Sequence, residues 1–282
     1  MKIFSSLSTA FFCLFIFSFS ISTAQELTDK FKYKATYELT WQIDSTNAES
    51  IQNETMLLFT GAGYSRFSSQ GQHIGDSIQR VYKERERTPQ SFSEMRSKIP
   101  ETKFKYYINK KLADREINFQ EEIVKDYYEY SEDLSSIEWN ILPETKDISG
   151  FAVQKAKTSY AGRNYTAWFT SEIPIPDGPY KFNGLPGLII KIADKKEYYV
   201  FKLTGFKSLK DPIFDTESGE DYLEVDKNKF REIKEEYNAD PIAALGRSGM
   251  TISFKSGLGQ KEKMMKEHRK ELKKQNNPIE LK

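Results

Sequence analysis

The chain of 282 residues offers two histidines for acid–base or nucleophilic chemistry. His73 lies in a glycine- and glutamine-rich stretch that we expect to be a polar loop, and His268 lies in a strongly charged stretch near the C-terminus. A serine-based triad needs a histidine held rigidly between its nucleophile and a carboxylate. No serine here is surrounded by the glycines of a nucleophile elbow. The sequence therefore argues against a histidine-dependent hydrolase.

An acidic segment could offer hard oxygen ligands to calcium; its members are Asp215, Glu217, Glu220, Asp221 and Glu224. A helix–loop–helix calcium site needs a glycine at a fixed place among its ligands, and glycine is misplaced in this segment. We therefore expect a solvated loop, with no metal and no other cofactor.

Carboxylates that cleave sugars come together in space rather than in sequence. A hydrolase of that kind would be favoured if certain acids converged in a cleft with displaced pKa values. The acids in question are Asp147, Glu172, Asp177 and Asp194.

Arg163, Trp168 and Lys155 lie together in a region rich in strand signals. An arginine beside an aromatic ring can hold an anionic or aromatic ligand through hydrogen bonds and cation–π contact. In the structural alternative, Arg163 caps loop carbonyls and Trp168 packs under a nearby proline-rich corner. We favour the structural alternative and keep Arg163 and Trp168 as candidate ligand-binding residues.

That corner is the segment Lys181 to Ile190, in which Gly184, Pro186 and Gly187 punctuate an otherwise apolar run. Glycine supplies backbone angles that other residues resist, and proline fixes one angle in advance. Leu185-Pro186-Gly187-Leu188 suits a type II turn, with proline and glycine at its two central positions. The corner either shapes the mouth of a ligand site or only turns the chain, so its glycines and proline are also candidate binding residues.

The elements that would position these residues are mostly strands. Phe31 to Ile43 alternates apolar and polar residues without a break, which predicts one buried and one wet face of an antiparallel strand. Strand character also marks the stretches Thr55–Phe59, Tyr64–Phe67, Lys103–Asn109, Glu116–Tyr130, Phe151–Tyr160, Tyr165–Thr170, Leu188–Ala193, Tyr198–Phe206 and Thr251–Phe254. Between them we expect hairpin loops at 161–164 and 194–197 and a turn at 109–111. We expect a mainly β fold: one large, curved antiparallel sheet, resembling half a barrel, with a few C-terminal helices.

Helical signals come late. Asp226 can cap a helix, and Asp240-Pro241 can begin a short one that ends at Gly246. Lys261 to Lys274 is so charged that we expect a solvated helix or frayed tail. Ser68 to Pro100 reads as a surface excursion with a short helix near its end.

Residues 1–24 resemble a secretory signal peptide, with Lys2 before an apolar run and small residues before Gln25. We therefore expect an exported chain without a membrane span after cleavage, periplasmic, outer-membrane-associated or secreted. The single cysteine, Cys13, would be removed, which leaves no disulfide or thiol chemistry. One domain would cover 25–256, followed by a charged helix or tail at 257–282. A formal net charge of +1 disfavours nucleic-acid binding.

The run from Trp139 through Asp147-Ile148-Ser149-Gly150-Phe151 to Gly184-Leu185-Pro186-Gly187-Leu188-Ile189 resembles the GLPGLI family. The ending Asn277-Pro278-Ile279-Glu280-Leu281 resembles the usual tail of that family. The resemblance implies a secreted or envelope protein of a Gram-negative bacterium and implies no reaction. Many members carry a cysteine about where Val153 stands here.

Three functions remain open. The first is a non-catalytic binding protein whose concave apolar face holds a hydrophobic ligand, a lipid or a segment of a partner protein. The second is the carboxylate-based hydrolase. The third is a structural or assembly partner of outer-membrane machinery, with the charged tail making contacts.

Overall fold

The computed structural model describes residues 30–86, 88–214, 221–247, 249 and 258–282. The expected signal peptide, most of the acidic segment and the expected strand Thr251–Phe254 lie outside these residues. The described chain forms one sheet whose strands are β1 (Lys30–Gln42), β2 (Ile51–Thr60), β3 (Tyr64–Ser69), β4 (Tyr106–Lys111), β5 (Glu116–Ile123), β6 (Asp126–Asp133), β7 (Asn140–Ile148), β8 (Phe151–Tyr160), β9 (Arg163–Thr170), β10 (Leu188–Asp194), β11 (Tyr199–Phe214) and β12 (Tyr222–Glu224).

The sheet is open, and its strand order is β12-β6-β5-β4-β3-β2-β1-β11-β10-β9-β8-β7. All neighbours are antiparallel except β12, which runs parallel to β6. The prediction of a mainly β fold built on one large antiparallel sheet is confirmed.

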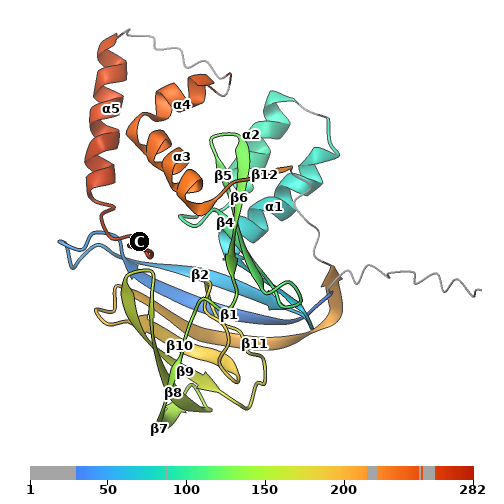
Figure 1. Ribbon diagram of the computed structural model, residues 1–282. Coiled ribbons are helices and arrows are strands. Elements are labelled where there is room, and N and C mark those ends of the chain that lie inside the picture. Colours follow the sequence, from blue (N-terminus) through green and yellow to red (C-terminus); the bar gives the residue numbers. More distant parts are fainter. Residues whose placement is uncertain (1–29, 87, 215–220, 248, 250–257) are drawn as a thin grey trace, which may run out of the picture.

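Five helices accompany the sheet in the part of the chain that the structure describes: α1 (Gln70–Lys83), α2 (Pro89–Lys98), α3 (Lys227–Ala239), α4 (Pro241–Arg247) and α5 (Leu258–Lys273). Figure 1 shows them gathered at one end of the molecule, whereas β7 to β10 form the opposite end. Helices α1 and α2 lie on one side of the β5–β6 hairpin, and α3 and α4 lie on its other side. Three of the five are C-terminal, as expected, α2 matches the short helix expected near the end of Ser68 to Pro100, and α1 was not expected.

Strand β1 shows why the sheet has two different faces. Tyr37, Leu39 and Trp41 are buried in the main hydrophobic core, as their alternation predicts. We call the face that carries them the inner face, and the opposite one the outer face. Phe31 departs from the prediction, because a register shift lies between it and Tyr33. It packs instead in a small second cluster with Leu57 and Phe59 on the outer face. That cluster is a second, smaller apolar region.

Several boundaries differ from the sequence-based expectation. The expected turn at 109–111 is wrong, since these residues belong to β4 and the chain turns at Leu112–Arg115. Glu116 to Tyr130 is not one strand but the hairpin of β5 and β6, which turns with Val124 at a φ of 69°. Strand β7 was not expected at all. The loop at 161–164 is shorter than expected, because Tyr160 already pairs with Arg163.

The late helices follow their signals. The side chain of Asp226 accepts hydrogen bonds from the backbone N–H groups of Asn228 and Lys229, which caps α3. Helix α4 begins at Pro241. The charged stretch forms α5, with Met265 buried and Met264 exposed. The residues after α5 are not frayed: Asn276 to Leu281 returns to the sheet, where Leu281 N–H donates to the carbonyl of Ala161.

Candidate functional site

The proline- and glycine-rich corner belongs to the connection between β9 and β10, residues 171–187, and from here on we use the name for this whole connection, which packs on the inner face of the sheet. Phe182 and Leu185 are buried in the main core, beside residues from both halves of the sheet. The expected type II turn is wrong. Gly187 N–H donates to the carbonyl of Leu185 at 2.7 Å, so the chain makes a three-residue γ-turn around Pro186.

Gly187 is the tightest point of the corner. Its φ is +153°, and an added Cβ would lie 2.0 Å from the carbonyl oxygen of Thr170. Gly184 also has a positive φ, of +87°, but its nearest neighbour would be Trp139 at 4.0 Å. Gly187 is therefore required by packing against β9, whereas Gly184 is required only by backbone angle.

A buried ion pair holds the first part of the corner. The ammonium of Lys110, on β4, lies 2.5 Å from a carboxylate oxygen of Asp177 and donates also to the carbonyls of Gly178 and Phe182. The Lys110 side chain is 2% exposed. Burial lowers the pKa of Lys110, and the charge of Asp177 opposes that shift. The pair ties the corner to the middle of the sheet.

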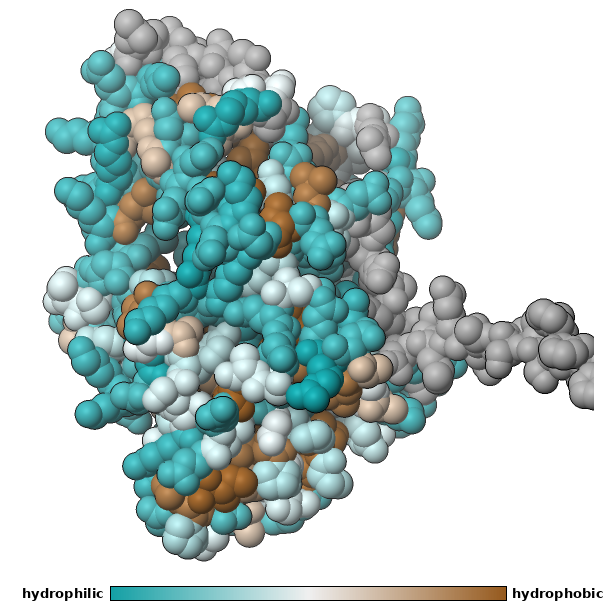
Figure 2. Space-filling model, viewed as in Figure 1, coloured by the Kyte–Doolittle hydropathy of each residue, from teal (hydrophilic) through white to brown (hydrophobic). Residues whose placement is uncertain are grey.

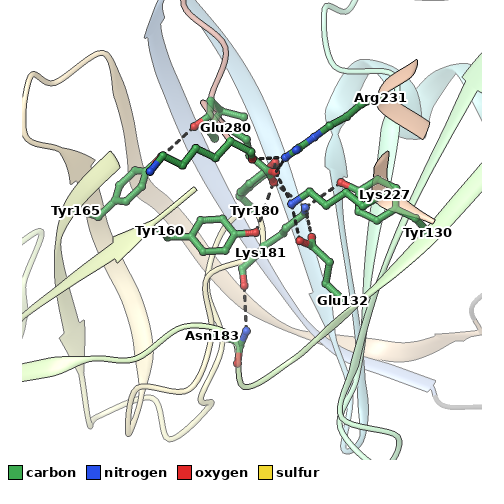
Figure 3. Close-up of polar contacts among 12 residues, drawn as sticks. Tyr130, Glu132, Tyr160, Tyr165, Tyr180, Lys181, Asn183, Lys227, Arg231 and Glu280 are labelled. Carbon is green, nitrogen blue, oxygen red and sulfur yellow. Dashed lines mark hydrogen bonds and ion pairs between the residues drawn. The ribbon is translucent and has the colours of Figure 1, made fainter. Parts of the chain in front are cut away.

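A second buried cluster forms around Lys181, four residues after Asp177 in the chain (Figure 3). Lys181 is fully buried, and its ammonium contacts Tyr130, Glu132 and Glu280, the last at 2.6 Å. Lys227, at the start of α3, binds the same two carboxylates at 2.5 and 2.8 Å. Four elements far apart in sequence therefore meet at one point: β6, the corner, α3 and the C-terminal tail.

Glu280 is the centre of this cluster. It accepts hydrogen bonds from Tyr180 at 2.6 Å and from Lys181. Burial would raise the pKa of Glu280, but the charge of Lys181 and hydrogen bonds from Lys181, Lys227 and Tyr180 outweigh burial and lower it to about 2. The cluster is thus a locked set of opposite charges, since each group has partners in fixed positions.

Arg163 is the first of the sequence-predicted residues, and its side chain is buried. Its guanidinium donates to the carbonyls of Pro278 and Ile279, to the amide oxygen of Asn277, and to Asp194 at 3.2 Å. It caps carbonyls, as in the structural alternative, but they belong to the C-terminal tail rather than to a neighbouring loop. Arg163 holds that tail against the inner face.

Trp168 does not pack under the proline corner. It lies on the outer face, where the ammonium of Lys146 sits 3.8 Å from its ring centroid and that of Lys155 sits at 5.7 Å. The tryptophan at the corner is Trp139, whose indole N–H donates to the carbonyl of Asn183 at 2.7 Å. The structure therefore separates Arg163 from Trp168 by the thickness of the sheet. Pro186 is exposed.

The four carboxylates proposed for a hydrolase are each bonded to structural partners. Asp177 and Asp194 are paired with Lys110 and Arg163. Asp147 accepts from the backbone N–H of Gly150 in the β7–β8 turn, and Glu172 accepts from that of Ala152. These contacts fix strands and turns.

A large groove lies on the other side of the sheet, between α1–α2 and the outer face of β2 to β5. Its volume is about 1830 Å³. Phe59, Arg66, Tyr107 and Gln120 form its floor. One wall is α1, which carries only two buried residues, and another is α2, which has none. Figure 2 shows the largely hydrophilic surface that these upper elements present.

Helix α1 corrects the expectation for His73, which is helical and not part of a loop. Its ring lies 5.1 Å from that of Phe59. Burial, and then the charges of Arg80, Lys34 and Arg66, lower the pKa of His73. His268 is also helical, with Nε2 2.8 Å from the carbonyl oxygen of Asn238.

Asp76 is the unusual carboxyl of the groove. Burial raises its pKa to about 6, although Arg80, Arg66 and a hydrogen bond from Gln72 oppose the shift. A half-buried acid that titrates near neutral pH is a feature of binding and catalytic sites. The groove therefore combines accessibility with displaced pKa values, and the inner corner does not.

Among the residues that the structure describes, no three histidine, cysteine, aspartate or glutamate side chains are placed to hold a metal ion together. Within the same residues, no helix has both the length and the apolar character that crossing a bilayer requires.

Comparison with known proteins gives a short family match and a similar fold. A family model described as "Protein of unknown function (Porph_ging)" matches residues 158–191, which span β9 and the corner. No curated protein matches the chain. The solved structure of PNGF-II in space group P21 has a TM-score of 0.50 at 17% identity, over 72% of this chain and 33% of that one. The C2 crystal form matches at 0.49 and 17%, over 72% and 32%.

The chain thus spans about a third of the length of the solved structures it matches. At this identity the likeness concerns the fold alone. The family match covers the corner that holds Asp177 and Lys181, together with Arg163.

Sequence reasoning missed most of the inner cluster. Lys110, Lys181, Glu132 and Glu280 were not candidates, although Lys181 lies in the corner segment and Glu280 in the tail on which the resemblance rests. The available signal was the presence of a lysine and a glutamate, 99 residues apart, in two stretches that both resembled one family.

Proposed function

We propose that the protein is an exported, non-catalytic binding protein of the GLPGLI type, and that it holds an extended segment of a partner protein in the groove between α1–α2 and the sheet. Export and membership of the family rest on the N-terminal residues and the corner motif. The observation that carries the binding role is the α1–α2 insertion itself.

The insertion adds a groove without adding to the core. Strands β3 and β4 are neighbours in the sheet, with Phe67 paired to Ile108, so a two-residue turn would suffice to join them. Residues 70–105 instead form two helices that bury few side chains. Ordering so many residues costs conformational entropy, which little burial offsets. We infer that the helices serve an occupant of the groove.

The lining of the groove suits a segment of a partner protein better than it suits a lipid. The inner apolar face, where a hydrophobic ligand was expected, is covered by Phe182, Leu185 and their neighbours from the corner. The groove mixes aromatic residues such as Tyr107 and Phe92 with amides and charges. Such a lining suits a peptide, whose backbone needs hydrogen-bond partners and whose side chains need apolar contacts.

The hydrolase alternative is weaker because the four carboxylates named for it hold strands and turns. The assembly alternative placed the contacts in the charged tail, but that tail carries Asn277 and Glu280, which anchor the fold.

Site-specific photocrosslinking tests the proposal. A benzoylphenylalanine at Gln79, exposed in the groove, should give adducts in cells that express the full chain, whereas one at Glu267, exposed on α5, should not. Replacing residues 70–105 with Asn-Gly should abolish the adducts of a crosslinker placed at Gln120 and leave the sheet folded by circular dichroism. Equal adducts from the groove and α5 positions, or a lipid that native mass spectrometry finds retained in the shortened protein, would count against a partner segment in the groove.

A further inference from the structure

The outer face of β8 to β11 carries a row of lysines, although the formal net charge of the chain is only +1. Lys155, Trp168, Lys191 and Lys202 form one straight row across four neighbouring strands, because each pairs with the next in the sheet register. Lys146 on β7 reaches into the row and lies over the ring of Trp168. The row and Lys146 together present four ammonium groups, of which those of Lys146 and Lys155 lie near the ring of Trp168.

The row includes a direct like-charge pair. Lys191 and Lys202 stand opposite each other in the β10–β11 ladder, and like charges in that position destabilise a sheet. A second such pair, Lys34 and Lys207, continues the pattern on β1 and β11. Burial and the charge of Lys207 lower the pKa of Lys34. An arrangement that lowers the stability of the fold indicates that the positive charge is used.

Nearby acids neutralise only part of this charge. Glu144 lies 3.3 Å from Lys155, and Glu197, itself 72% exposed, lies 3.9 Å from Lys191. The row ends at Glu38, which pairs with Lys202 in the strand register but makes no ion pair within 4 Å in the part of the chain that the structure describes. Lys146 has its contact with Trp168 instead of an acid.

No helix of the described residues covers this region. Helix α1 packs on β2 and β3, and Figure 1 shows all five helices at the end of the molecule away from β7 to β10. Lys146 and Lys202 are exposed, and Lys155, Trp168 and Lys191 are half-buried. Lysine stems lie along apolar surface while their ammonium groups stay in water, and tryptophan prefers the boundary between water and apolar phases.

From these observations we propose that the outer face of β8 to β11 docks on the anionic phosphate headgroups of a membrane surface, with Lys191 and Lys202 as its central contacts and Trp168 at the lipid boundary. The surface is separate from the α1–α2 groove, so this proposal does not depend on the groove's occupant.

Vesicle sedimentation tests the proposal. The chain from Gln25 to Lys282, without the expected signal peptide, should bind vesicles of phosphatidylcholine with 30% phosphatidylglycerol and should not bind phosphatidylcholine alone, and salt should weaken the binding. The double variant Lys191→Gln/Lys202→Gln should lower the partition coefficient about 30-fold, which corresponds to ~1 kcal/mol per lysine. The matched variant Lys263→Gln/Lys266→Gln on α5 removes the same charge elsewhere and should change binding less than twofold.

Two further measurements separate docking from misfolding and from other anionic partners. The Lys191→Gln/Lys202→Gln variant should be at least as stable to urea as the parent, because it removes a repulsion. Vesicles should shift the parent's tryptophan emission to shorter wavelength, and Trp168→Phe should remove that shift. Equal binding to neutral vesicles, equal loss in the α5 variant, or retention on a soluble acidic polysaccharide without any vesicle binding would overturn the lipid assignment.

Discussion

The inner corner and the outer groove use the same kinds of side chain in opposite ways. At the corner, Lys181 is fully buried and Glu280, from the C-terminal tail, is 13% exposed; each has several partners, and the pKa of Glu280 falls to about 2. In the groove, Asp76 is half-buried beside Arg66 and Arg80, and its pKa rises to about 6. Burial acts on both carboxyls, so the difference lies in their partners. Fully paired charges stabilise a fold, whereas an underpaired acid destabilises it and stays available to a ligand.

The largest expected effect comes from removing the buried cation of the corner. Lys181→Met should lower the free energy of unfolding by about 3–5 kcal/mol, because Glu132 and Glu280 lose their enclosed partner. The matched variant Lys227→Met touches the same two carboxylates from a position that is 25% exposed, and it should cost only about 1 kcal/mol. Urea unfolding of both proteins measures the difference. Equal losses would show that enclosure does not distinguish the two lysines.

The next effect depends on pH and concerns Glu280. Its folded pKa is depressed from the usual 4.5 to about 2, so the stabilisation is complete above pH 4.5 and disappears as the pH falls through 2. The depression corresponds to about 3 kcal/mol. Glu280→Gln should therefore cost about that much at pH 7, and the gap between variant and parent should narrow between pH 4.5 and pH 2. A gap that stays constant over this range would contradict the assignment.

Removing the charge of Asp76 should change the stability in the opposite direction. Its folded pKa is raised from 3.8 to about 6, so ionisation of this carboxyl destabilises the folded state, increasingly so between pH 4 and pH 6. Asp76→Asn should stabilise the protein by about 2 kcal/mol at pH 8, allowing for screening by solvent at the groove. The two proteins should become equally stable below pH 4. Thermal melts across this range provide the measurement. If the Asp76→Asn variant is less stable than the parent at pH 8, then ionised Asp76 does not destabilise the folded state.

Much of this architecture follows from local patterns. The alternation of β1 gives a strand with one apolar face, and Asp226 and Pro241 mark helix starts because capping and proline geometry are local effects. Helix α1 was missed because Gly71 and Gly75 make the stretch resemble a loop, although Ile74, Ile78 and Tyr82 follow helical spacing. The turn at Val124 was missed because it contains neither glycine nor proline.

The candidate site was much less predictable than the fold. The ion pairs of the corner join residues 67 and 99 positions apart, and no periodicity or spacing encodes which lysine meets which acid. That the turn needs a glycine at position 187 is a local property and could be predicted from the sequence. The close approach of Gly187 to Thr170 could not. For Trp168 the pattern indicated a strand but gave no means of choosing its face, because a shift of one residue reverses the face.

The smallest expected effect tests whether hydrogen-bond partners, rather than burial alone, also decide how much a side chain on the inner face contributes to stability. Tyr37 and Tyr106 are both buried, but the hydroxyl of Tyr37 donates to the carbonyl of Ile189 at 2.8 Å, whereas that of Tyr106 has no hydrogen-bond partner among the described residues. Tyr37→Phe should cost about 1 kcal/mol, since it leaves a buried carbonyl without its donor. Tyr106→Phe should be neutral or slightly stabilising, because it removes an unpaired hydroxyl and keeps the ring. Urea unfolding at pH 7 compares the two, and an equal loss in both would mean that the volume around each ring, not its hydrogen bond, sets the stability of this face.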